Sequence, residues 1–461
     1  MEVRDRTMSF TKGLNVLEPP LLEFKAGKKG IDPVMAFAVL DYNPLEVPDL
    51  SSTPKIYPLI PKHDKTSKNV MTILNDLRRG KMGKYPRSKY KAFSKTFGFD
   101  IEIEDCEEYE GESDVYRKIT EVSRLSDRKA HIIVVVSPER SQLGGFYYDI
   151  KKTSTEKEVQ TQFILRKTIE NYVQEMDDSD RGDFLWNFSF GIFSKLGGTP
   201  WKLHRVLEGV SAFMSINTVS SYAEQGITER KGVVALELAN SWGNPIGRFY
   251  VKDVGVEVEE GAIFVDLKTI DALTKKALDQ VEQELADAEK SKAEDYVIVH
   301  IKDRYADQVY DKIASAIAAK GFRKFKIIHI QEQGPLRLYD TSKSRGSSWP
   351  QEGTYWYLED GNIAFLYTLG GWRYSISEGK EPYVIGTHDV SPLQVNFTKG
   401  DENSRLTNDD LRHIYHLTRL HYYSADLPRI KMPFTLRLGE RAARLAASGL
   451  ASLDFPISFL Y

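Results

Sequence analysis

The feature that most constrains the fold is an unbroken run from His131 to Val136, with Ile or Val at every position after the histidine. Such a run without polar alternation is typical of a strand buried on both faces, as in a parallel sheet between layers of helices. Helical patterns flank the run at 114–126 and 147–152. The sequence therefore predicts an α/β unit around this strand.

The charge balance limits the kind of nucleic-acid site that the chain can carry. The 461 residues include 63 Lys and Arg against 66 Asp and Glu, so the net charge is −3. A chain so close to neutrality lacks an overall positive coat. Any nucleic-acid site must therefore be a local basic groove.

The single cysteine, Cys106, excludes an intramolecular disulfide and the zinc or iron–sulfur sites that need several thiolates. It favours a reducing compartment. No stretch approaches the roughly 18 consecutive apolar residues of a membrane span, and the opening residues contain no signal-peptide run. We therefore expect a cytoplasmic protein that does not contact a membrane.

The middle of the chain carries a second pattern of elements. Strand patterns occur at 207–217, 231–239 and 247–253. They are followed by a helix pattern at 267–292, a strand at 296–302, a helix at 305–320 and a strand at 324–331. Three strands followed by helix, strand, helix and strand is the order of an RNase-H-like domain, although other α/β folds share it.

The common nucleotide-binding and zinc motifs are absent from the sequence. One pair of residues is more informative. Tyr147 and Lys151 are four residues apart, so on a helix they lie on one face. They follow the buried strand, where an α/β unit presents helix N-termini to phosphates. The pair could hold a terminal phosphate, and the alternative is ordinary surface packing with an extended lysine.

A longer motif extends this interpretation. The stretch from Lys195 to Trp201 reads Lys-Leu-Gly-Gly-Thr-Pro-Trp and resembles the Lys-x-Gly-Gly-x-Pro-Trp segment between the MID and PIWI domains of Argonaute proteins. Tyr147 and Lys151 followed by Gln162 resemble the Tyr-x-x-x-Lys…Gln set of the MID pocket. Weaker matches to PIWI segments occur at 353–354, 386–387, 392–395, 417–420 and 427–428. The opening, Leu17-Glu18-Pro19, is similar to that of short prokaryotic Argonautes, which lack the N and PAZ domains.

The resemblance implies an α/β protein with a Rossmann-like MID domain and an RNase-H-like PIWI domain. Residues 1–55 would form a lead-in that packs on PIWI, 56–195 the MID domain and 196–461 the PIWI domain. Tyr147, Lys151, Gln162 and Lys195 would line the pocket for the guide 5′-phosphate, with Gln160 as the alternative to Gln162. The resemblance also implies a Mg²⁺ or Mn²⁺ ion at that phosphate, held with the help of the C-terminal carboxylate of Tyr461.

Cleavage by an RNase-H-like site needs carboxylates that hold two metal ions about 4 Å apart. By the resemblance, Ser211 takes the place of the first catalytic Asp, while Asp303 and Glu440 fall near the other degenerate positions. We therefore expect a guide-binding module that does not cut. One alternative is an active RNase-H-like nuclease with an unusual carboxylate set. Another is a metabolic α/β enzyme whose motifs are coincidental.

The resemblance also implies partners. Short Argonautes pair a guide, RNA or DNA, with single-stranded target DNA in prokaryotic antiviral defence. They form a heterodimer with a protein that carries an APAZ domain and a sirtuin-like NADase, a TIR NADase or a nuclease. Nothing in this sequence identifies such an effector.

Overall fold

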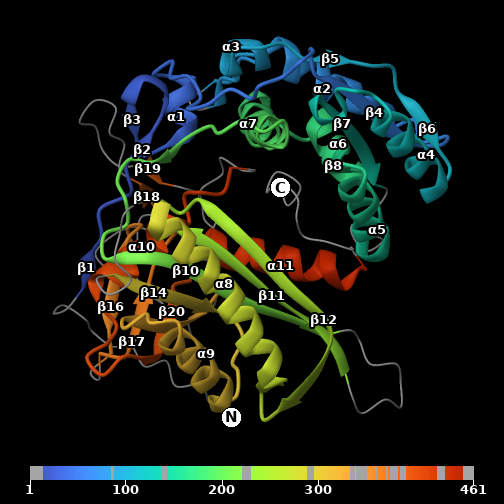
Figure 1. Ribbon diagram of the computed structural model, residues 1–461. Coiled ribbons are helices and arrows are strands. Elements are labelled where there is room, and N and C mark those ends of the chain that lie inside the picture. The colour runs from blue at the N-terminus through green and yellow to red at the C-terminus, as the bar shows by residue number, and fades with distance from the viewer. Residues whose placement is uncertain are drawn as a thin grey trace, which may run out of the picture.

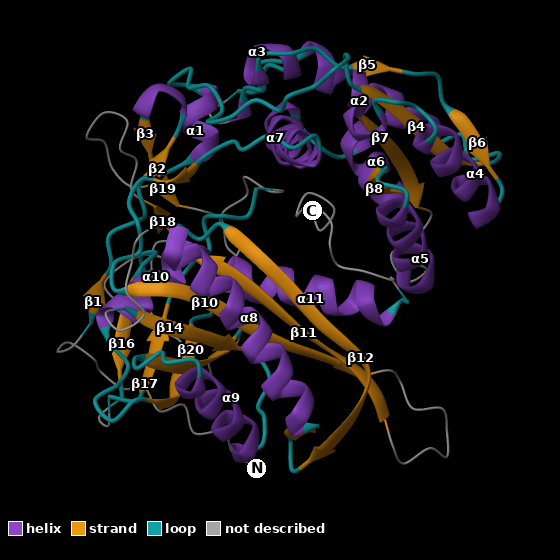
Figure 2. Cartoon of the chain, viewed as in Figure 1, coloured by secondary structure: helices purple, strands orange, loops and turns teal. Residues whose placement is uncertain are grey.

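The computed structural model describes residues 14–84, 88–137, 143–220, 230–287, 295–332, 338, 350–358, 361–369, 372–373, 383–384, 391–422 and 431–449. Two lobes are visible in Figure 1, one coloured blue to teal and the other green to red. Figure 2 shows that each lobe combines a sheet with helices. The α/β class predicted from the sequence is confirmed.

The first lobe is built on a five-stranded parallel sheet in the order β5-β4-β7-β8, with β6 also paired to β4. Its strands are β4 (Lys55–Pro61), β5 (Glu102–Ile103), β6 (Glu107–Tyr109), β7 (His131–Ser137) and β8 (Gln160–Leu165). All seven residues of β7 are buried. This strand contains the run that predicted it, and its position inside the sheet explains why residues 132–136 are apolar on both faces.

Helices cover both faces of this sheet. Ile132, Val134 and Val136 pack in one core with the helices of one face, and Ile133 and Val135 pack in another with those of the opposite face. The first group is α2 (Val70–Arg79), α3 (Phe93–Phe97), α6 (Arg166–Gln174) and α7 (Asp178–Lys195), and the second is α4 (Glu112–Ser123) and α5 (Leu143–Glu156). Alternate β7 residues therefore stabilise opposite layers, as in a Rossmann-like domain.

The second lobe is built on a ten-stranded sheet in the order β1-β16-β17-β20-β15-β14-β10-β11-β12-β13. Its strands are β1 (Asn15–Val16), β10 (Val210–Ser220), β11 (Arg230–Asn240), β12 (Pro245–Glu259), β13 (Ala262–Val265), β14 (Tyr296–Ile301), β15 (Phe325–Gln331), β16 (Thr354–Tyr357), β17 (Ile363–Leu366) and β20 (Leu393–Gly400). Strand β10 pairs antiparallel with β11 and parallel with β14. This central order is the RNase-H-like arrangement that the element order predicted.

Two helical layers cover the second sheet. The β10 residues Ala212, Met214 and Ile216 pack with α8 (Leu267–Asp287) and α9 (Asp307–Ala319). On the opposite face, Phe213 shares a core with α10 (Asn408–Leu417) and α11 (Phe434–Ala447). Odd-numbered β10 residues therefore face α11, and this alternation sets which side chains meet that helix.

The lead-in segment contacts both lobes. Strand β1 extends the second sheet by pairing with β16, while β2 (Leu22–Glu23) joins β3 (Lys29–Gly30) and β9 (Lys202–Leu203) in a small separate sheet. Helix α1 (Pro33–Ala38) places Phe37 against Phe190 of α7. The segment was predicted to pack on the second lobe. Its described residues pack on both lobes. The remaining short elements are η1 (Lys25–Gly27), η2 (Ser67–Asn69), η4 (Arg128–Ala130), β18 (Trp372–Arg373) and β19 (Tyr383–Val384).

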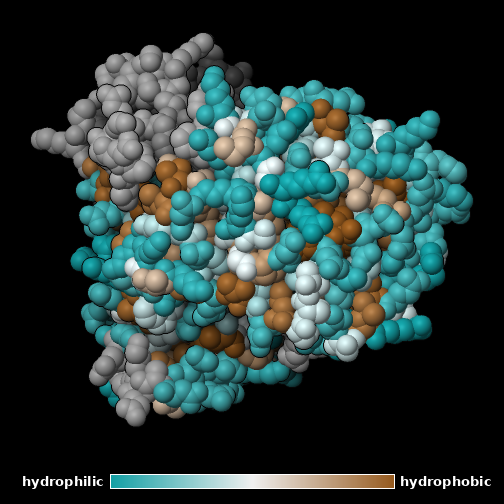
Figure 3. Space-filling view, turned by 90° about the horizontal axis from the view of Figure 1, so that it is seen from above, coloured by the Kyte–Doolittle hydropathy of each residue, from teal (hydrophilic) through white to brown (hydrophobic). Residues whose placement is uncertain are grey.

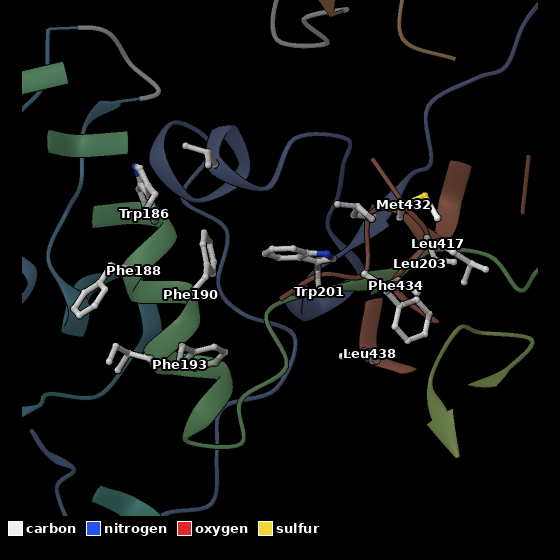
Figure 4. Close-up of a cluster of buried hydrophobic side chains, with 14 of the residues drawn as sticks. Trp186, Phe188, Phe190, Phe193, Trp201, Leu203, Leu417, Met432, Phe434 and Leu438 are labelled. Carbon is white, nitrogen blue, oxygen red and sulfur yellow. The ribbon is translucent and has the colours of Figure 1, made fainter. Parts of the chain in front are cut away.

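The junction between the lobes is an aromatic cluster around Trp201. Trp201 is fully buried, packs on Phe190, and donates a hydrogen bond from Nε1 to the carbonyl oxygen of Arg419 at 2.9 Å. Figure 4 shows the α7 aromatic residues on one side of this indole and Leu417, Phe434 and Leu438 of the second lobe on the other. Gly197 ends α7 with φ +94°, and a side chain on Gly198 would collide with Phe193. The Gly-Gly-x-Pro-Trp motif therefore builds the connection between the lobes.

The face in Figure 3 is dominated by hydrophilic residues, and hydrophobic ones appear there in small groups. Among the described residues, no helix combines the length and apolar character that a membrane crossing requires.

Replacing the junction indole tests this view of the connection. We expect Trp201→Ala to destabilise the protein by about 3–5 kcal/mol, because it leaves a cavity and an unpaired carbonyl group. Trp242→Ala is the matched control, since Trp242 is 38% exposed, and should cost less than about 1 kcal/mol. Denaturant unfolding measures both variants. Equal losses would contradict a structural role for the motif.

Candidate nucleic-acid interface

Helix α5 positions the Tyr147–Lys151 pair. Lys151 is only 3% exposed, and its Nζ donates a hydrogen bond to the backbone oxygen of Thr161 on β8 at 2.8 Å. The same Nζ lies 5.9 Å from the centre of the Tyr147 ring. Tyr147 in turn packs on Phe163, with ring centres 4.8 Å apart. The pair is thus an interior feature, and the surface-packing alternative does not describe it.

A second buried lysine comes from α7. Lys195 occupies the last turn of this helix, where the helix dipole favours a cation, and it is 3% exposed. The Gly197 turn ends the helix directly after it. Lys195 therefore lies where the first lobe joins the second, as the motif implied.

The third basic group is Arg441 on α11, which sequence reasoning missed. Its charge acts on Lys151, Lys195 and Tyr147, so these groups of three helices lie close together. A signal was present in the sequence, since Arg437, Arg441 and Arg444 recur at intervals of four and three residues. At this spacing they form a basic stripe along one face of the last described helix.

The pKa values of the two lysines show how unusual this cluster is. Burial, aided by the Arg441 charge, lowers the pKa of Lys151 to about 7. Burial and the charges of Lys151 and Arg441 hold the pKa of Lys195 well below its usual range. Neither lysine forms an ion pair with any carboxylate in the described parts of the chain. Because an uncompensated buried cation is destabilising, the arrangement is suited to receive an anion.

Gln162 lies on β8, but the structure does not bring it into contact with the lysines. Its Nε2 donates a hydrogen bond to the backbone oxygen of Phe163 at 3.0 Å. Gln160, Gln162 and Ile164 alternate with Phe163, so they occupy the sheet face covered by α7. Gln160 is buried on that face and Gln162 is half-buried. A role for either glutamine therefore stays a prediction.

A cavity of about 340 Å³ lies beside this cluster, between α5 and α11. Its walls are formed by Tyr148, Lys302, Glu332, Met432, Leu436, Arg437, Glu440, Arg441 and Arg444. Four of these residues are basic and two are acidic, so the cavity is cationic. It is a local basic groove of the kind that the near-neutral composition required.

A second group of polar residues includes Lys302 and Glu440 of this cavity wall. Ile216 on β10 pairs with Ile301 on β14, so Asn217 lies near the level of Lys302 and Asp303. Asn217 packs against Gly439 of α11, where an added Cβ would lie 2.1 Å from its Nδ2. Glu440 follows Gly439 directly. The carboxyl-terminal parts of the parallel strands β10 and β14 thus meet the turn of α11 that contains Gly439 and Glu440.

Ser211 does not belong to this group. It lies at the start of β10, next to a register shift between Val210 and Ala212, and six residues before Asn217. At about 3.3 Å per residue, this separates the two positions by roughly 20 Å. The residue of β10 that accompanies Asp303 and Glu440 is therefore Asn217, and the assignment of Ser211 to the degenerate first position is corrected. Sequence pattern alone could not fix the strand register.

The charges at this second group are largely compensated. Lys302 Nζ lies 3.1 Å from Glu440 Oε2, and Arg444 Nη2 lies 2.8 Å from Glu440 Oε1. Burial opposes ionisation of Glu440, but these two cations hold its pKa below the usual range. Burial raises the pKa of Asp303, and the Glu440 charge adds to this. The nearby Glu237 is fully buried and paired with Arg248 at 2.6 Å.

The metal expectation falls partly outside the described residues, because Tyr461 is not among them. The residues expected to hold the phosphate, Tyr147, Lys151 and Lys195, include no carboxylate ligand. No cluster of three or more His, Cys, Asp or Glu suited to a metal occurs in the described ranges. These residues alone therefore do not fit a divalent ion.

Comparison with known proteins complements this geometry. No protein-family model and no curated protein matches the sequence. Solved structures do match. Clostridium butyricum Argonaute, bound to a guide DNA and a 19-mer target DNA, superposes with a TM-score of 0.65 and 18% identity over 95% of this chain. The chain has an Argonaute fold.

Other Argonaute structures agree. A. aeolicus Argonaute with externally bound siRNA matches with a TM-score of 0.60 and 16% identity over 97% of this chain. Marinitoga piezophila Argonaute in complex with a 5′ OH guide RNA matches with a TM-score of 0.58 and 11% identity over 97%. The chain covers 53%, 56% and 59% of these three structures, so it spans little more than half the length of these Argonautes. The two lobes are consistent with the MID and PIWI domains.

The lowered lysine pKa values predict a pH dependence for anion binding. Above pH 7, Lys151 is largely neutral in the free protein, and a bound phosphate favours its charged form. Binding must therefore take up a proton, and Lys195 adds to this effect. Between pH 7.5 and 9, we expect the affinity for a 5′-phosphorylated oligonucleotide to fall by up to about tenfold per pH unit for each lysine that takes up a proton.

Calorimetry in buffers of different ionisation enthalpy measures this proton uptake directly. A 5′-hydroxyl oligonucleotide of the same sequence is the control, and it should show a much weaker pH dependence. An affinity for the phosphorylated strand that stays constant over this range would contradict the placement of the lysines.

Proposed function

We propose that this Argonaute-fold protein binds a guide nucleic acid, RNA or DNA, by its 5′-phosphate and pairs it with single-stranded target DNA without cutting. One observation carries the proposal. Lys151 and Lys195 are each 3% exposed, the Arg441 charge acts on both, and neither lysine has a carboxylate partner in the described chain. A terminal phosphate, with up to two negative charges, is the ligand that best matches this cluster.

The residues would divide the work of binding. The ammonium groups of Lys151 and Lys195 and the Arg441 guanidinium would donate charge-assisted hydrogen bonds to the phosphate oxygens. The Tyr147 hydroxyl would donate a further one, since burial raises the pKa of Tyr147 and keeps it protonated. A 5′-hydroxyl guide, as in the M. piezophila complex, would leave the cations uncompensated. The phosphate is therefore the better-supported guide end.

Replacing Lys195 with an apolar residue of similar length separates a binding role from a structural one. We expect Lys195→Met to raise the melting temperature, because it removes an amino group whose burial is destabilising, whether the group stays charged or gives up its proton. The same change should lower the affinity for a 5′-phosphorylated guide by about 10- to 100-fold, the loss of one charge-assisted contact. Differential scanning fluorimetry and filter binding measure the two effects.

Lys167→Met is the matched control, because Lys167 lies on α6 of the same lobe and its side chain is 68% exposed. It should change neither quantity appreciably. A Lys195→Met protein that melts earlier and keeps its guide affinity would show that Lys195 serves the fold.

The absence of cutting is proposed from the Asn217 group. Asn217 is neutral, Glu440 is paired with two cations, and the pKa of Asp303 is raised by burial. A two-metal mechanism needs several ionised carboxylates around the scissile phosphate. We therefore propose that this PIWI-like lobe holds the guide–target duplex and leaves the target intact.

The nuclease alternative has its own test. A guide, an end-labelled complementary target and Mn²⁺ or Mg²⁺ are incubated with the protein, and we expect no product above the protein-free control. A defined cut that disappears in Asp303→Ala would establish an unusual catalytic set instead. The Asn217→Asp variant serves as a comparison, because it restores a carboxylate at the level of Asp303.

The remaining proposals rest on the resemblance to short prokaryotic Argonautes. They also rest on the finding that this chain covers little more than half the length of the matched Argonaute structures. They are a cytoplasmic role in antiviral defence and activation of an APAZ-containing NADase or nuclease partner. A Mg²⁺ or Mn²⁺ ion at the 5′-phosphate is proposed with Tyr461 and the guide phosphates as ligands. Chelation with EDTA should then weaken guide loading.

A further inference from the structure

The carboxyl ends of β10, β14 and β15 present polar residues at one edge of the second sheet, where open α/β sheets bind their ligands. Asn217 belongs to β10, Lys302 follows β14, and Glu332 follows β15. The His329 ring donates a hydrogen bond from Nε2 to the Lys302 backbone oxygen at 2.9 Å. This bond ties the start of the Lys302 loop to the neighbouring strand.

The side chain of Lys302 lies between two carboxylates and faces the cavity. Its Nζ is 3.1 Å from Glu440 and 3.9 Å from Glu332, and all three residues line the cavity wall. The Lys302 and Glu440 side chains are 33% and 32% exposed. An ion pair with this exposure contributes little to stability, so a purely structural role explains the arrangement poorly.

Glu440 has a second partner that keeps it compensated. Arg444 holds the other carboxylate oxygen at 2.8 Å, so the Lys302 ammonium can turn to a different anion without leaving Glu440 unpaired. Asn217 adds no negative charge that would repel such an anion. The group therefore offers a cation that can exchange its partner at the wall of a basic cavity.

We propose that Lys302 binds a phosphodiester group of the nucleic-acid strand that crosses this sheet edge, and that it does so without a metal ion. The inference rests on the proposed function, since it requires that a guide–target duplex occupies the cavity side of the PIWI-like lobe. A single ammonium neutralises one phosphate but cannot activate water as a pair of metal ions does. The site would thus retain the strand and leave it uncut.

The two partners of the ion pair should act in opposite directions. Lys302→Gln removes the cation and should weaken the binding of target to guide-loaded protein by about three- to tenfold at moderate salt. The slope of the logarithm of the binding constant against the logarithm of the salt concentration should become shallower by about one, because one phosphate contact is lost. Glu440→Gln removes the competing carboxylate and should strengthen target binding. Both results should be the same at the lowest Mg²⁺ concentration that sustains guide loading and at a higher one.

Lys399 and Asp311 supply the matched control, because they form a comparable exposed ion pair on the α9 side of the same sheet. Lys399→Gln should leave the salt slope unchanged. A series of targets, each with one neutral methylphosphonate linkage, locates the contact. At one position, the neutral linkage should weaken target binding by the parent protein. At the same position, it should not weaken target binding by the Lys302→Gln variant any further.

The outcomes separate this inference from the proposed function. If guide and target bind the parent protein but Lys302→Gln keeps the full salt slope and the same methylphosphonate profile, Lys302 is not a phosphate contact. Weakened target binding in Glu440→Gln would also overturn the inference, because the ion pair would then support the duplex as a unit. If the parent protein binds no guide at all, the proposed function itself fails.

Discussion

The account depends on one electrostatic constraint, namely the burial of Lys151 and Lys195 beside Arg441 without a compensating carboxylate among the described residues. Burial of ammonium groups costs several kcal/mol, and a protein retains such an arrangement where a ligand offsets the cost. The three cations come from α5, α7 and α11, so the cluster forms only when both lobes are folded and docked. The aromatic core around Trp201 supplies that docking.

The same architecture connects the buried lysines to the second polar group. Helix α11 carries its apolar face against β10 and β11, and its basic stripe borders the cavity from Arg437 to Arg444. Glu440 and Arg441 are adjacent on this helix, so one element links the second polar group with the buried lysines. A strand anchored at one end by its phosphate would run along this helix towards the carboxyl ends of β10 and β14.

Much of the fold could be predicted from the sequence, because its signals are local. The β-branched run marked β7, the element order marked the RNase-H-like sheet, and the Gly-Gly-x-Pro-Trp motif marked the junction. The boundaries were less accurate. Helix α5 spans Leu143–Glu156, whereas the pattern predicted a helix only over 147–152. Strand β13 has only four residues and gave no usable pattern.

The sites were harder to predict, because they depend on register and on distant segments. Tyr147, Lys151 and Lys195 followed from motifs, but Arg441 joins them only through the docking of α11. Ser211 and Asn217 lie on one strand, and only the pairing of β10 with β14 shows which of them accompanies Asp303.

The most direct test compares two guides of identical sequence that differ only at the 5′ end. A competition experiment with the parent protein measures the ratio of their dissociation constants at neutral pH and fixed salt. The account predicts that the phosphorylated guide binds at least about 100-fold more tightly, since two or more charge-assisted contacts depend on it. Equal affinities would contradict the assignment of the buried lysines to a guide phosphate.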